Sequence, residues 1–408
     1  MMKPVVIIGA GQAGSQAAVS LRQFGWKGGI ILIGEENYAP YQRPPLSKKF
    51  LEGDLPFERL LLKPETYYQT SEIGLRKSVR VEAINPEEKT VSLSNGEVVE
   101  FSSAIIATGT TPRRLPDDEI DGAFYLRSVA DSLALQDRIV DGAKIVVIGA
   151  GYIGLEVAAT ARKRGASVTV IEAAPRIMAR VTGDFISGYI QQYHEKQGVE
   201  FRMPHIVNEL MSENGKLISC KLDNGDEIDA DIAVIGIGVL PCDELAASAS
   251  IECDNGIKVD ENCRTNQPDI YAAGDCTNHY NEHFAVQVRL ESVHNAIEQG
   301  KTAAAAIVGD EKPYRQAPWF WSDQFDLKIQ SVGINAGHDD VFAFEDPEKN
   351  AVSAFYFKNE ALLAVDAINR PADYLAVRKL LQDKVPISRA DIETANGDLK
   401  TLLSKKPS

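Results

Sequence analysis

The sequence predicts an α/β fold of two or three domains in which one strand–helix–strand unit occurs twice. Three observations support this prediction. The chain has 408 residues, which is more than one hydrophobic core of ordinary size accommodates. A short apolar run followed by a glycine-rich turn occurs at residues 5–14 and again at residues 144–154. Each turn leads into a helix-forming segment and then into a second apolar run, at 29–34 and 167–172.

The composition is that of a soluble globular protein and disfavours nucleic-acid binding. Hydrophobic residues make up 44% of the chain and charged residues 25%. The 58 acidic residues outnumber the 43 basic ones, so the net charge is −15, whereas phosphate binding needs a concentrated basic surface. No apolar run approaches the roughly 18 to 20 residues of a membrane span, and the first apolar strand begins at Val5. We therefore expect a cytoplasmic protein without a targeting segment.

The first glycine-rich turn, Gly9-Ala10-Gly11-Gln12-Ala13-Gly14, has the spacing of a dinucleotide-binding turn. Gly9 permits a tight turn, and Gly11 lets the backbone approach a pyrophosphate. Gly14 lets the following helix pack close to the strand, with its positive N terminus directed at the phosphates. Glu35 ends the second apolar run, where a carboxylate can accept hydrogen bonds from ribose hydroxyls.

The second unit repeats this arrangement with Gly149, Gly151 and Gly154, and its second apolar run ends at Glu172. A carboxylate at that position binds free ribose hydroxyls and repels a 2′-phosphate, so NADH is favoured over NADPH. Arg176 follows four residues later and weakens that preference. Two complete units in one chain predict two bound dinucleotides.

Two further turns carry signals for a cofactor. An apolar run leads into Thr108-Gly109, a small turn suited to a chain that crosses between domains near a dinucleotide, although an ordinary strand-to-loop turn explains it equally well. A second apolar run at 270–273 leads into Gly274, which we expect to open a helix-like approach. Asp275 can accept hydrogen bonds from a polyol chain.

Eight segments, in this order along nearly the whole chain, resemble the flavoprotein reductases of the glutathione-reductase superfamily. More narrowly, they resemble the NADH-dependent ferredoxin (redoxin) reductases of bacterial oxygenase systems, the putidaredoxin-reductase type. The segments are "PYQRPPLSKKF", "IIATGTTPR", "VVIGAGYIGLEVAATA", "GIGVLP", "IYAAGDC", "RLESVHNAIEQG", "PWFWSDQ" and "AVDAINRPADY".

The resemblance implies an α/β fold with two Rossmann-like nucleotide-binding domains, arranged as in glutathione reductase, plus a C-terminal α/β domain. The FAD-binding domain would be discontinuous, with residues 1–110 and 242–318. The NAD-binding domain would take residues 111–241, and the C-terminal domain residues 319–408.

The resemblance also implies the residues of the two cofactor sites. The implied FAD contacts are Gly9, Gly11, Ala13, Gly14, Glu35, Lys48, Val81, Thr108, Gly109, Arg127, Gly274, Asp275, Val293 and Trp321. The implied NADH contacts are Gly149, Gly151, Ile153, Gly154, Glu156, Glu172 and Gly238.

The function that follows is hydride transfer from NADH to FAD, with electrons then released singly to a two-iron two-sulfur ferredoxin that serves a cytochrome P450 or a ring-hydroxylating dioxygenase. Lys48, Glu156 and Trp321 are the catalytic candidates. A cation near the flavin's reactive edge stabilises negative charge on the reduced ring, and Glu156 can pair with Lys48 or orient the carboxamide. Without the resemblance, Lys48 reads as a solvated surface lysine. Trp321 would cover the flavin ring. Trp319 is separated from Trp321 by one residue, so both are expected on the same face of an extended segment.

One departure from the superfamily bears on the chemistry. Disulfide reductases carry a C-x4-C pair after the first ribose-binding strand, but residues 35–60 contain no cysteine. The five cysteines are odd in number and form no C-x-x-C pair, which suits a reducing compartment.

Two different functions stay open: an NADH oxidase or peroxide reductase with oxygen as the acceptor, and a binding protein similar to apoptosis-inducing factor.

Several features stay open or carry no functional prediction. We expect a basic docking patch for the redoxin, and the guesses for its residues are Arg43, Lys49, Arg289 and Arg315. The expected oligomeric state is a monomer or a homodimer. The pair His279 and His283 is assigned to a loop, not to a metal site. Residues 309–313 are expected to link to the last domain, and residues 402–408 to form a frayed tail.

Overall fold

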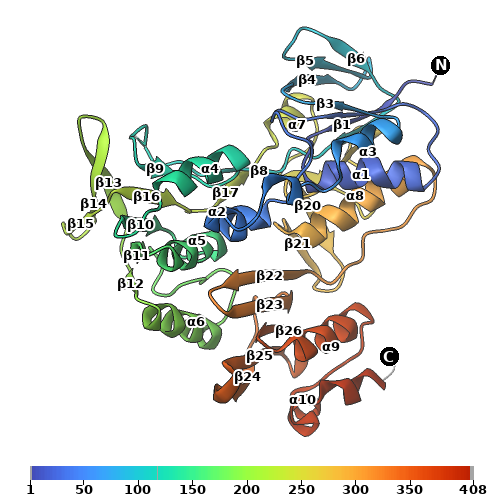
Figure 1. The fold of residues 1–408 in the computed structure, drawn as a ribbon. Coiled ribbons are helices and arrows are strands. Elements are labelled where there is room, and N and C mark those ends of the chain that lie inside the picture. Colours follow the sequence, from blue (N-terminus) through green and yellow to red (C-terminus); the bar gives the residue numbers. More distant parts are fainter. Residues whose placement is uncertain (1, 117, 405–408) are drawn as a thin grey trace. The chain divides into compact units, whose positions relative to one another are not determined.

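The computed structural model describes residues 2–116 and 118–404, and the chain forms two compact units (Figure 1). The first unit comprises Met1–Gln42, Phe57–Thr111 and Leu240–Pro318. The second unit comprises Arg43–Pro56, Pro112–Val239 and Trp319–Ser408. A short segment from within the first unit's sequence therefore belongs to the second unit.

The first unit is built on five parallel strands and two long helices, which are β1 (Val5–Ile8), α1 (Gln12–Gln23), β2 (Ile30–Ile33), β3 (Ile73–Arg76), β7 (Ser103–Ile106), β19 (Ile270–Ala272) and α8 (Val293–Ile307). The strand order is β19-β7-β1-β2-β3. All four residues of β1 are buried, as the apolar run predicts for a strand covered on both faces. Val5 of β1 is level with Ile30 of β2 and Ser103 of β7, so the carboxyl ends of these strands lie side by side. Figure 1 shows α1 beside α8.

The other elements of the first unit form small sheets and short helices around this core. They are η2 (Phe57–Arg59), α3 (Glu65–Thr70), β4 (Val81–Asn85), β5 (Thr90–Leu93), β6 (Val98–Glu100), α7 (Glu244–Ser248), β18 (Ile257–Val259), β20 (Thr277–Asn281) and β21 (Val286–Val288). Strands β4-β5-β6 form one sheet, and strands β18-β20-β21 form another. Where the chain passes from one unit to the other, β8 (Thr110–Pro112) and β17 (Val239–Pro241) pair with each other.

The second unit repeats the strand–helix–strand plan. Its parallel sheet and helices are β9 (Ala123–Phe124), α4 (Val129–Arg138), β10 (Lys144–Ile148), α5 (Tyr152–Lys163), β11 (Ser167–Ile171), α6 (Asp184–Lys196), β12 (Val199–Arg202) and β16 (Ile232–Ile235). The strand order is β12-β11-β10-β16-β9, with β10 in the central position that β1 holds in the first unit. This internal repeat confirms the prediction of two similar nucleotide-binding units.

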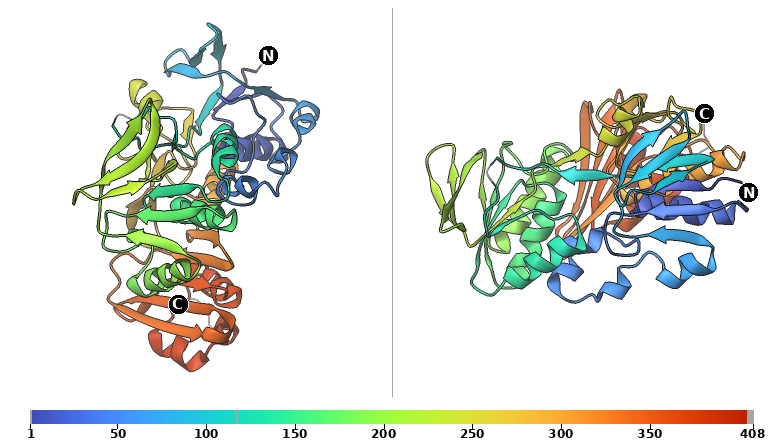
Figure 2. Two further views of the ribbon diagram at one scale, coloured as in Figure 1. Left: turned by 60° about the vertical axis from the view of Figure 1, so that its left-hand side comes forward. Right: turned by 90° about the horizontal axis from the view of Figure 1, so that it is seen from above.

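Two smaller parts join this sheet. Strands β13 (Val207–Glu213), β14 (Lys216–Leu222) and β15 (Glu227–Asp229) form an antiparallel sheet, whose long hairpin stands out from the second unit (Figure 2). The segment with η1 (Pro44–Ser47) and α2 (Lys49–Glu52) packs on α4 and α5. The Ser132 and Thr160 hydroxyls donate to the carbonyl oxygens of Leu46 and Ser47, which ties this segment to both helices.

The last part of the second unit is an antiparallel sheet with helices packed on it. Its elements are β22 (Trp319–Gln324), β23 (Leu327–Gly333), β24 (Asp340–Asp346), η3 (Pro347–Lys349), β25 (Ala351–Lys358), β26 (Ala361–Ile368), α9 (Pro371–Gln382), α10 (Arg389–Ala395) and η4 (Leu399–Ser404). The strand order is β22-β23-β26-β25-β24. This confirms the predicted C-terminal α/β fold.

Two local predictions were wrong. Gly274 does not open a helix-like approach, because its φ of +91° starts a turn that leads into β20. The expected frayed tail is partly ordered. η4 extends to Ser404, and Leu402 is buried in the core cluster to which α9 and α10 contribute. Residues 405–408 lie outside the described residues. Among the described residues, no helix combines the length and apolarity needed to cross a membrane.

Candidate functional site

The first glycine-rich turn, between β1 and α1, is shaped by contacts that exclude side chains. Gly9 has a φ of +110°, and a Cβ there would lie 2.2 Å from the Ala107 carbonyl oxygen. A Cβ on Gly14 would lie 1.9 Å from the Gly9 carbonyl oxygen. A Cβ on Gly11 would meet no protein atom within 4 Å, so this backbone faces open space. Helix α1 has no side-chain cap and no acid in its first turn, so its positive end suits a pyrophosphate.

The second turn, between β10 and α5, has the same geometry. Gly149 has a φ of +103°, and a Cβ there would lie 2.4 Å from the Gly236 carbonyl oxygen. A Cβ on Gly154 would lie 2.2 Å from the Gly149 carbonyl oxygen, whereas one on Gly151 would meet nothing within 4 Å. Helix α5 also begins without a side-chain cap or an acid in its first turn. The residues present therefore fit two dinucleotides, one in each unit.

The two ribose-binding candidates differ in how firmly they are held. The Glu35 side chain is 72% exposed and lies 3.8 Å from the Arg80 guanidinium. The Glu172 carboxylate accepts hydrogen bonds from the backbone N–H groups of Ala150 and Ala174, each at 2.8 Å. Glu172 is thus fixed against the second glycine-rich turn, where it can accept from ribose hydroxyls with its remaining lone pairs.

Arg176, which was expected to weaken the preference for NADH, has partners of its own. Its Nε lies 2.7 Å from the Asp184 carboxylate, and its Nη2 donates to the Ala179 carbonyl oxygen at 3.2 Å. These contacts direct the guanidinium toward the start of α6.

The loop that follows Glu172 is hydrogen-bonded, at its end, to the buried carboxyl group of Asp366 in β26. The Thr182 hydroxyl donates to Asp366 at 2.5 Å, and the Tyr356 hydroxyl donates to the same carboxyl oxygen at 2.8 Å. The Gly183 N–H donates to the Tyr356 hydroxyl at 3.1 Å. Asp366 is only 3% exposed, and burial raises its pKa above the usual value for aspartate.

This buried acid predicts a pH dependence of stability. Because the pKa of Asp366 is higher in the folded state, the folded protein binds more protons, and stability falls as pH rises between the unfolded and folded pKa values. We expect Asp366→Asn, which is neutral at every pH, to lose less free energy of unfolding between pH 4 and pH 8 than the wild type, as measured by urea denaturation at each pH. The exposed control Glu209→Gln should follow the wild type. Equal slopes for Asp366→Asn and wild type would contradict the prediction.

The two turns predicted near a flavin lie together with β7 and β19 in the first unit. The Gly274 N–H donates to the Gln299 side-chain oxygen at 2.8 Å. The Thr108 hydroxyl donates to the Cys242 carbonyl oxygen at 2.6 Å, and the Cys242 N–H donates to the Gly109 carbonyl oxygen at 2.9 Å. Thr108-Gly109 is therefore hydrogen-bonded to the residue that directly follows β17.

The remaining predicted cofactor residues divide between the units. In the first unit, Ala13 is buried near the start of α1, Val81 is buried at the start of β4, and Val293 is the first residue of α8. In the second unit, Ile153 is 46% exposed on α5, and Gly238 has a φ of +104°. Also in the second unit, Arg127 precedes α4, and its carbonyl oxygen accepts from Arg43 at 2.6 Å.

Lys48 and Glu156 form a buried ion pair within the second unit. Lys48 Nζ lies 2.9 Å from Glu156 Oε1, and the two side chains are 14% and 5% exposed. Glu156 also accepts from the Ser322 hydroxyl at 2.6 Å and from the Ser47 hydroxyl at 2.5 Å. The interpretation of Lys48 as a solvated surface lysine was therefore wrong, because three segments enclose the pair: the η1 region, α5 and β22.

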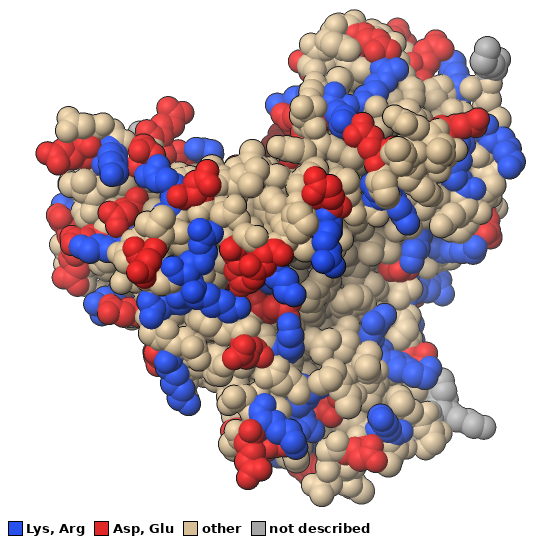
Figure 3. All heavy atoms as spheres, in the orientation of Figure 1, with Lys and Arg blue, Asp and Glu red and all other residues tan. Residues whose placement is uncertain are grey.

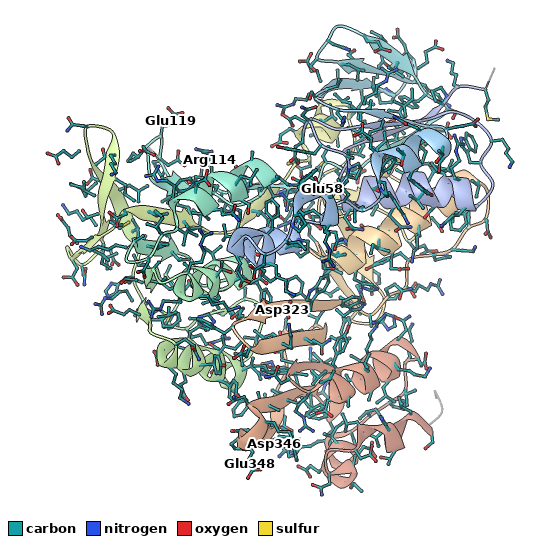
Figure 4. All side chains as sticks on the ribbon, viewed as in Figure 1. Glu58, Arg114, Glu119, Asp323, Asp346 and Glu348 are labelled. Carbon is teal, nitrogen blue, oxygen red and sulfur yellow. The ribbon has the colours of Figure 1, made fainter. Side chains whose placement is uncertain are left out.

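A chain of buried hydrogen bonds continues from Ser322 to α6. The Gln324 amide nitrogen donates to the Ser322 hydroxyl at 3.2 Å, and the Gln324 oxygen lies 2.9 Å from His194 Nε2. Burial lowers the pKa of His194 to about 4, so the ring is neutral at pH 7 and donates through Nε2. Asp323, labelled in Figure 4, lies between Ser322 and Gln324 and therefore on the opposite face of β22, where it pairs with Lys328 at 2.8 Å.

Trp319 and Trp321 lie on one face of β22, as predicted. Their ring centroids are 5.7 Å apart and the rings are tilted by 37°. Trp319 also packs edge-on against Tyr374, and the Arg378 guanidinium lies 4.7 Å from the centre of its ring. Trp319 is therefore a packing residue between β22 and α9, in line with its predicted minor role.

The cysteines offer no reactive thiol pair. All five are free, and Cys220, Cys263 and Cys276 are buried. Burial raises the pKa of Cys276 to about 11 and that of Cys220 to about 12, so these thiols stay protonated at pH 7. The part of the chain that the structure describes contains no group of three or more His, Cys, Asp or Glu residues able to hold a metal ion.

The prediction that His279 and His283 lie in a loop was wrong for His279 and correct for His283. His279 is buried in β20, and His283 lies in the turn that leads to β21. Asp275 is half-buried between β19 and β20.

The residues guessed for redoxin docking are unequal. The Arg289 side chain is 10% exposed and pairs with Glu291 at 2.7 Å, and Arg315 lies 3.4 Å from Glu282. Lys49 is exposed. On the face shown in Figure 3, basic and acidic side chains are interspersed. Arg289 is thus the weakest of these guesses.

Sequence reasoning missed several polar residues that surround the candidates, namely Ser47, Ser322, Gln324, His194 and Gln299. A weak signal was present for two of them. Ser322 and Gln324 alternate along a strand whose other residues are largely aromatic, which indicates buried polar groups that need partners.

Comparison with known proteins shows similarity along nearly the whole chain. Residues 3–300 match the family described as pyridine nucleotide-disulphide oxidoreductase, and residues 319–403 match the one described as reductase C-terminal. The chain is 40% identical to rhodocoxin reductase of Rhodococcus erythropolis, over 98% of this chain and 94% of that protein. It is also 40% identical to rubredoxin-NAD(+) reductase of Pseudomonas putida, over 90% and 96% of the two chains.

The fold gives the same result. The crystal structure of the covalent putidaredoxin reductase–putidaredoxin complex matches with a TM-score of 0.96 and 34% identity, over 98% of both chains. Because sequence and fold agree over nearly the full length, the chain belongs to the pyridine nucleotide-disulphide oxidoreductase family, among its ferredoxin reductases.

Proposed function

We propose that the protein takes a hydride from NADH and passes the electrons singly to a two-iron two-sulfur ferredoxin, which in turn serves a cytochrome P450 or a ring-hydroxylating dioxygenase. The observation that supports this most strongly is the presence of two complete dinucleotide turns, one in each unit, each with an open glycine and an uncapped helix N terminus. The first is assigned to FAD and the second to NADH. FAD, when bound, supplies the conversion from a two-electron donor to a one-electron acceptor.

The protein's own residues bind and orient the cofactors. The turns at Gly11 and Gly151 would receive the pyrophosphates, and Glu172 would hold the NADH ribose. Lys48 places a positive charge beside Glu156, and both are removed from solvent, so their charges act with little screening. Ser47 and Ser322 fix the orientation of the Glu156 carboxylate by donating to both of its oxygens.

The test is a sequence of two assays on the purified flavoprotein. NADH should bleach the yellow protein in the absence of air. Reduction of cytochrome c by NADH should then require an added two-iron two-sulfur ferredoxin. A protein that is not bleached, or that reduces cytochrome c equally well without ferredoxin, would contradict the proposal.

The acceptor has one further candidate with a specific observation in its favour. The rubredoxin-NAD(+) reductase relative is as similar as rhodocoxin reductase, at 40% identity. The same cytochrome c assay with a rubredoxin in place of the ferredoxin separates the two, and the ratio of the two kcat/KM values identifies the better acceptor.

Oxygen reduction, peroxide reduction and DNA binding have less support as functions of this protein. A peroxide reductase needs a reactive cysteine, and the buried thiols described above stay protonated. An NADH oxidase would consume oxygen at full rate without any redoxin, which a measurement of oxygen consumption with NADH alone reveals. A DNA-binding role conflicts with the net charge of −15, and a gel shift at modest salt concentration tests it.

Glu172 carries a prediction about cofactor choice. Replacing Glu172 by Ala removes a charged acceptor for the ribose hydroxyls, so we expect kcat/KM for NADH to fall by about tenfold or more, with a smaller effect on NADPH. The matched control is Glu35→Ala in the first unit, which should leave the NADH-to-NADPH ratio unchanged. An unchanged ratio in Glu172→Ala would show that selectivity resides elsewhere.

A further inference from the structure

Two adjacent residues of α8, Gln299 and Gly300, contact both turns that are assigned to FAD. We propose that they are positioning residues for FAD: they fix the pyrophosphate turn around Ala13 relative to the ribityl-binding turn at Gly274-Asp275. Neither residue belongs to the set of expected cofactor contacts. The inference rests on the proposed function only in taking FAD as the ligand of the first unit.

Gly300 sets the distance between α1 and α8. A Cβ on Gly300 would lie 2.7 Å from the Ala13 carbonyl oxygen and 3.2 Å from the Ala17 backbone nitrogen. Both contacts are to backbone atoms, so they cannot be relieved by rotating a side chain. Any larger residue at position 300 must therefore move α1, and with it the turn that precedes α1.

Gln299 holds the second turn. It is fully buried, and its side-chain oxygen accepts from the Gly274 N–H and the Thr277 hydroxyl, each at 2.8 Å. The Asn295 amide donates to the same oxygen at 3.2 Å. Gln299 therefore satisfies the backbone N–H of the residue that immediately precedes Asp275.

The other end of Gln299 is fixed as well. Its amide nitrogen lies 3.3 Å from Nδ1 of His279 in β20. This nitrogen can donate only to a neutral imidazole with a free lone pair at Nδ1. Burial lowers the pKa of His279 to about 4, which keeps that lone pair available at neutral pH. The amide is thus held in one orientation, with its oxygen toward Gly274.

The two turns meet at Ala13. Gly274 has a φ of +91°, and a Cβ there would lie 2.9 Å from the Cβ of Ala13. Ala13 is therefore touched by Gly274 at its side chain and approached by Gly300 at its carbonyl oxygen. A ligand that spans both turns binds well only if their separation is correct, because misplacing one turn loses the contacts at that end.

The experiment measures FAD affinity directly. Apoprotein is prepared for wild type, Gly300→Ala, Gln299→Leu and Gln299→Glu, and the Kd for FAD is obtained from the quenching of flavin fluorescence. We expect Gly300→Ala and Gln299→Leu to weaken FAD binding by about tenfold or more. Gln299→Glu keeps the acceptor for the Gly274 N–H but loses the donor to His279, so its Kd for FAD should fall between those of Gln299→Leu and wild type. The matched control is Gly188→Ala, a helical glycine in α6 whose added Cβ meets no atom within 4 Å.

Two readouts separate positioning from general damage. The Kd of each apoprotein for NAD+, which is assigned to the second unit, should stay close to wild type, even where thermal unfolding shows the local loss of stability that these substitutions in the first unit entail. Overturning results would be FAD affinities within twofold of wild type, or a loss of NAD+ affinity that parallels the loss of FAD affinity. Should Gly300→Ala give no soluble protein, the contrast between Gln299→Leu and Gln299→Glu decides alone. None of these measurements uses a ferredoxin, so a failed ferredoxin assay leaves this result standing.

Discussion

Replacing Lys48 by Met is expected to lower the free energy of unfolding by about 3 kcal/mol and to slow the reduction of bound FAD by NADH. The substitution leaves Glu156 as a buried carboxylate without its cation, and the Glu156 side chain is only 5% exposed. The hydroxyls of Ser47 and Ser322 still donate to it, which places the expected loss at the lower end of the range for breaking a buried pair. Urea denaturation measures the first effect and anaerobic stopped-flow mixing with NADH the second.

A double-mutant cycle separates the pair from its surroundings. Glu156→Gln in the Lys48→Met background should recover part of the lost stability, because it removes the uncompensated charge. Lys163→Met is the matched control. Lys163 lies on α5, the helix that carries Glu156, and pairs at 3.0 Å with Glu52 of α2, but its side chain is 43% exposed. We expect it to cost less than about 1 kcal/mol. An unaltered rate of FAD reduction in Lys48→Met would remove this residue from the mechanism.

Alanine at Gly11 and at Gly151 is expected to abolish one cofactor at a time. Neither added Cβ meets a protein atom within 4 Å, so the fold should persist, while the methyl group occupies the space through which the backbone approaches a pyrophosphate. Gly11→Ala should purify without FAD and therefore colourless. Gly151→Ala should purify yellow but resist bleaching by NADH.

This crossed design also tests which unit binds which cofactor. Absorbance of the bound flavin before and after anaerobic addition of NADH gives both readouts, and circular dichroism checks the fold. Colourless Gly151→Ala together with yellow Gly11→Ala would exchange the two assignments. Two variants with normal colour and normal bleaching would contradict both.

Features that depend on a few consecutive residues could be predicted from the sequence. The turn at Gly9–Gly14 is an example, because the strand before it, the glycine spacing and the helix after it are all local. β1 begins at Val5 as predicted, while α1 begins at Gln12, inside the segment that was predicted as the turn. The second turn was predicted for the same reason. The assignment of FAD to one turn and NADH to the other came from the resemblance and not from the spacing.

Contacts between distant segments could not be predicted from the residues alone. Lys48 and Glu156 are 108 positions apart, and only the resemblance suggested that they pair. Ser322 and His194 were missed because their partners come from other segments of the chain. Gly274 was assigned the wrong local structure because a glycine with positive φ precedes a strand as readily as a helix.

The interleaved sequence of the two units has a consequence for biosynthesis. The central sheet of the first unit needs β19, and its pyrophosphate turn packs against α8, which ends at Ile307 of 408 residues. A ribosome must therefore deliver most of the polypeptide before the N-terminal turn acquires its final neighbours. Long-range pairing of this kind slows folding and prolongs exposure of apolar strands. Capture of the flavin is thus expected late in translation or after release, and flavin shortage in the cell should appear as aggregated nascent protein.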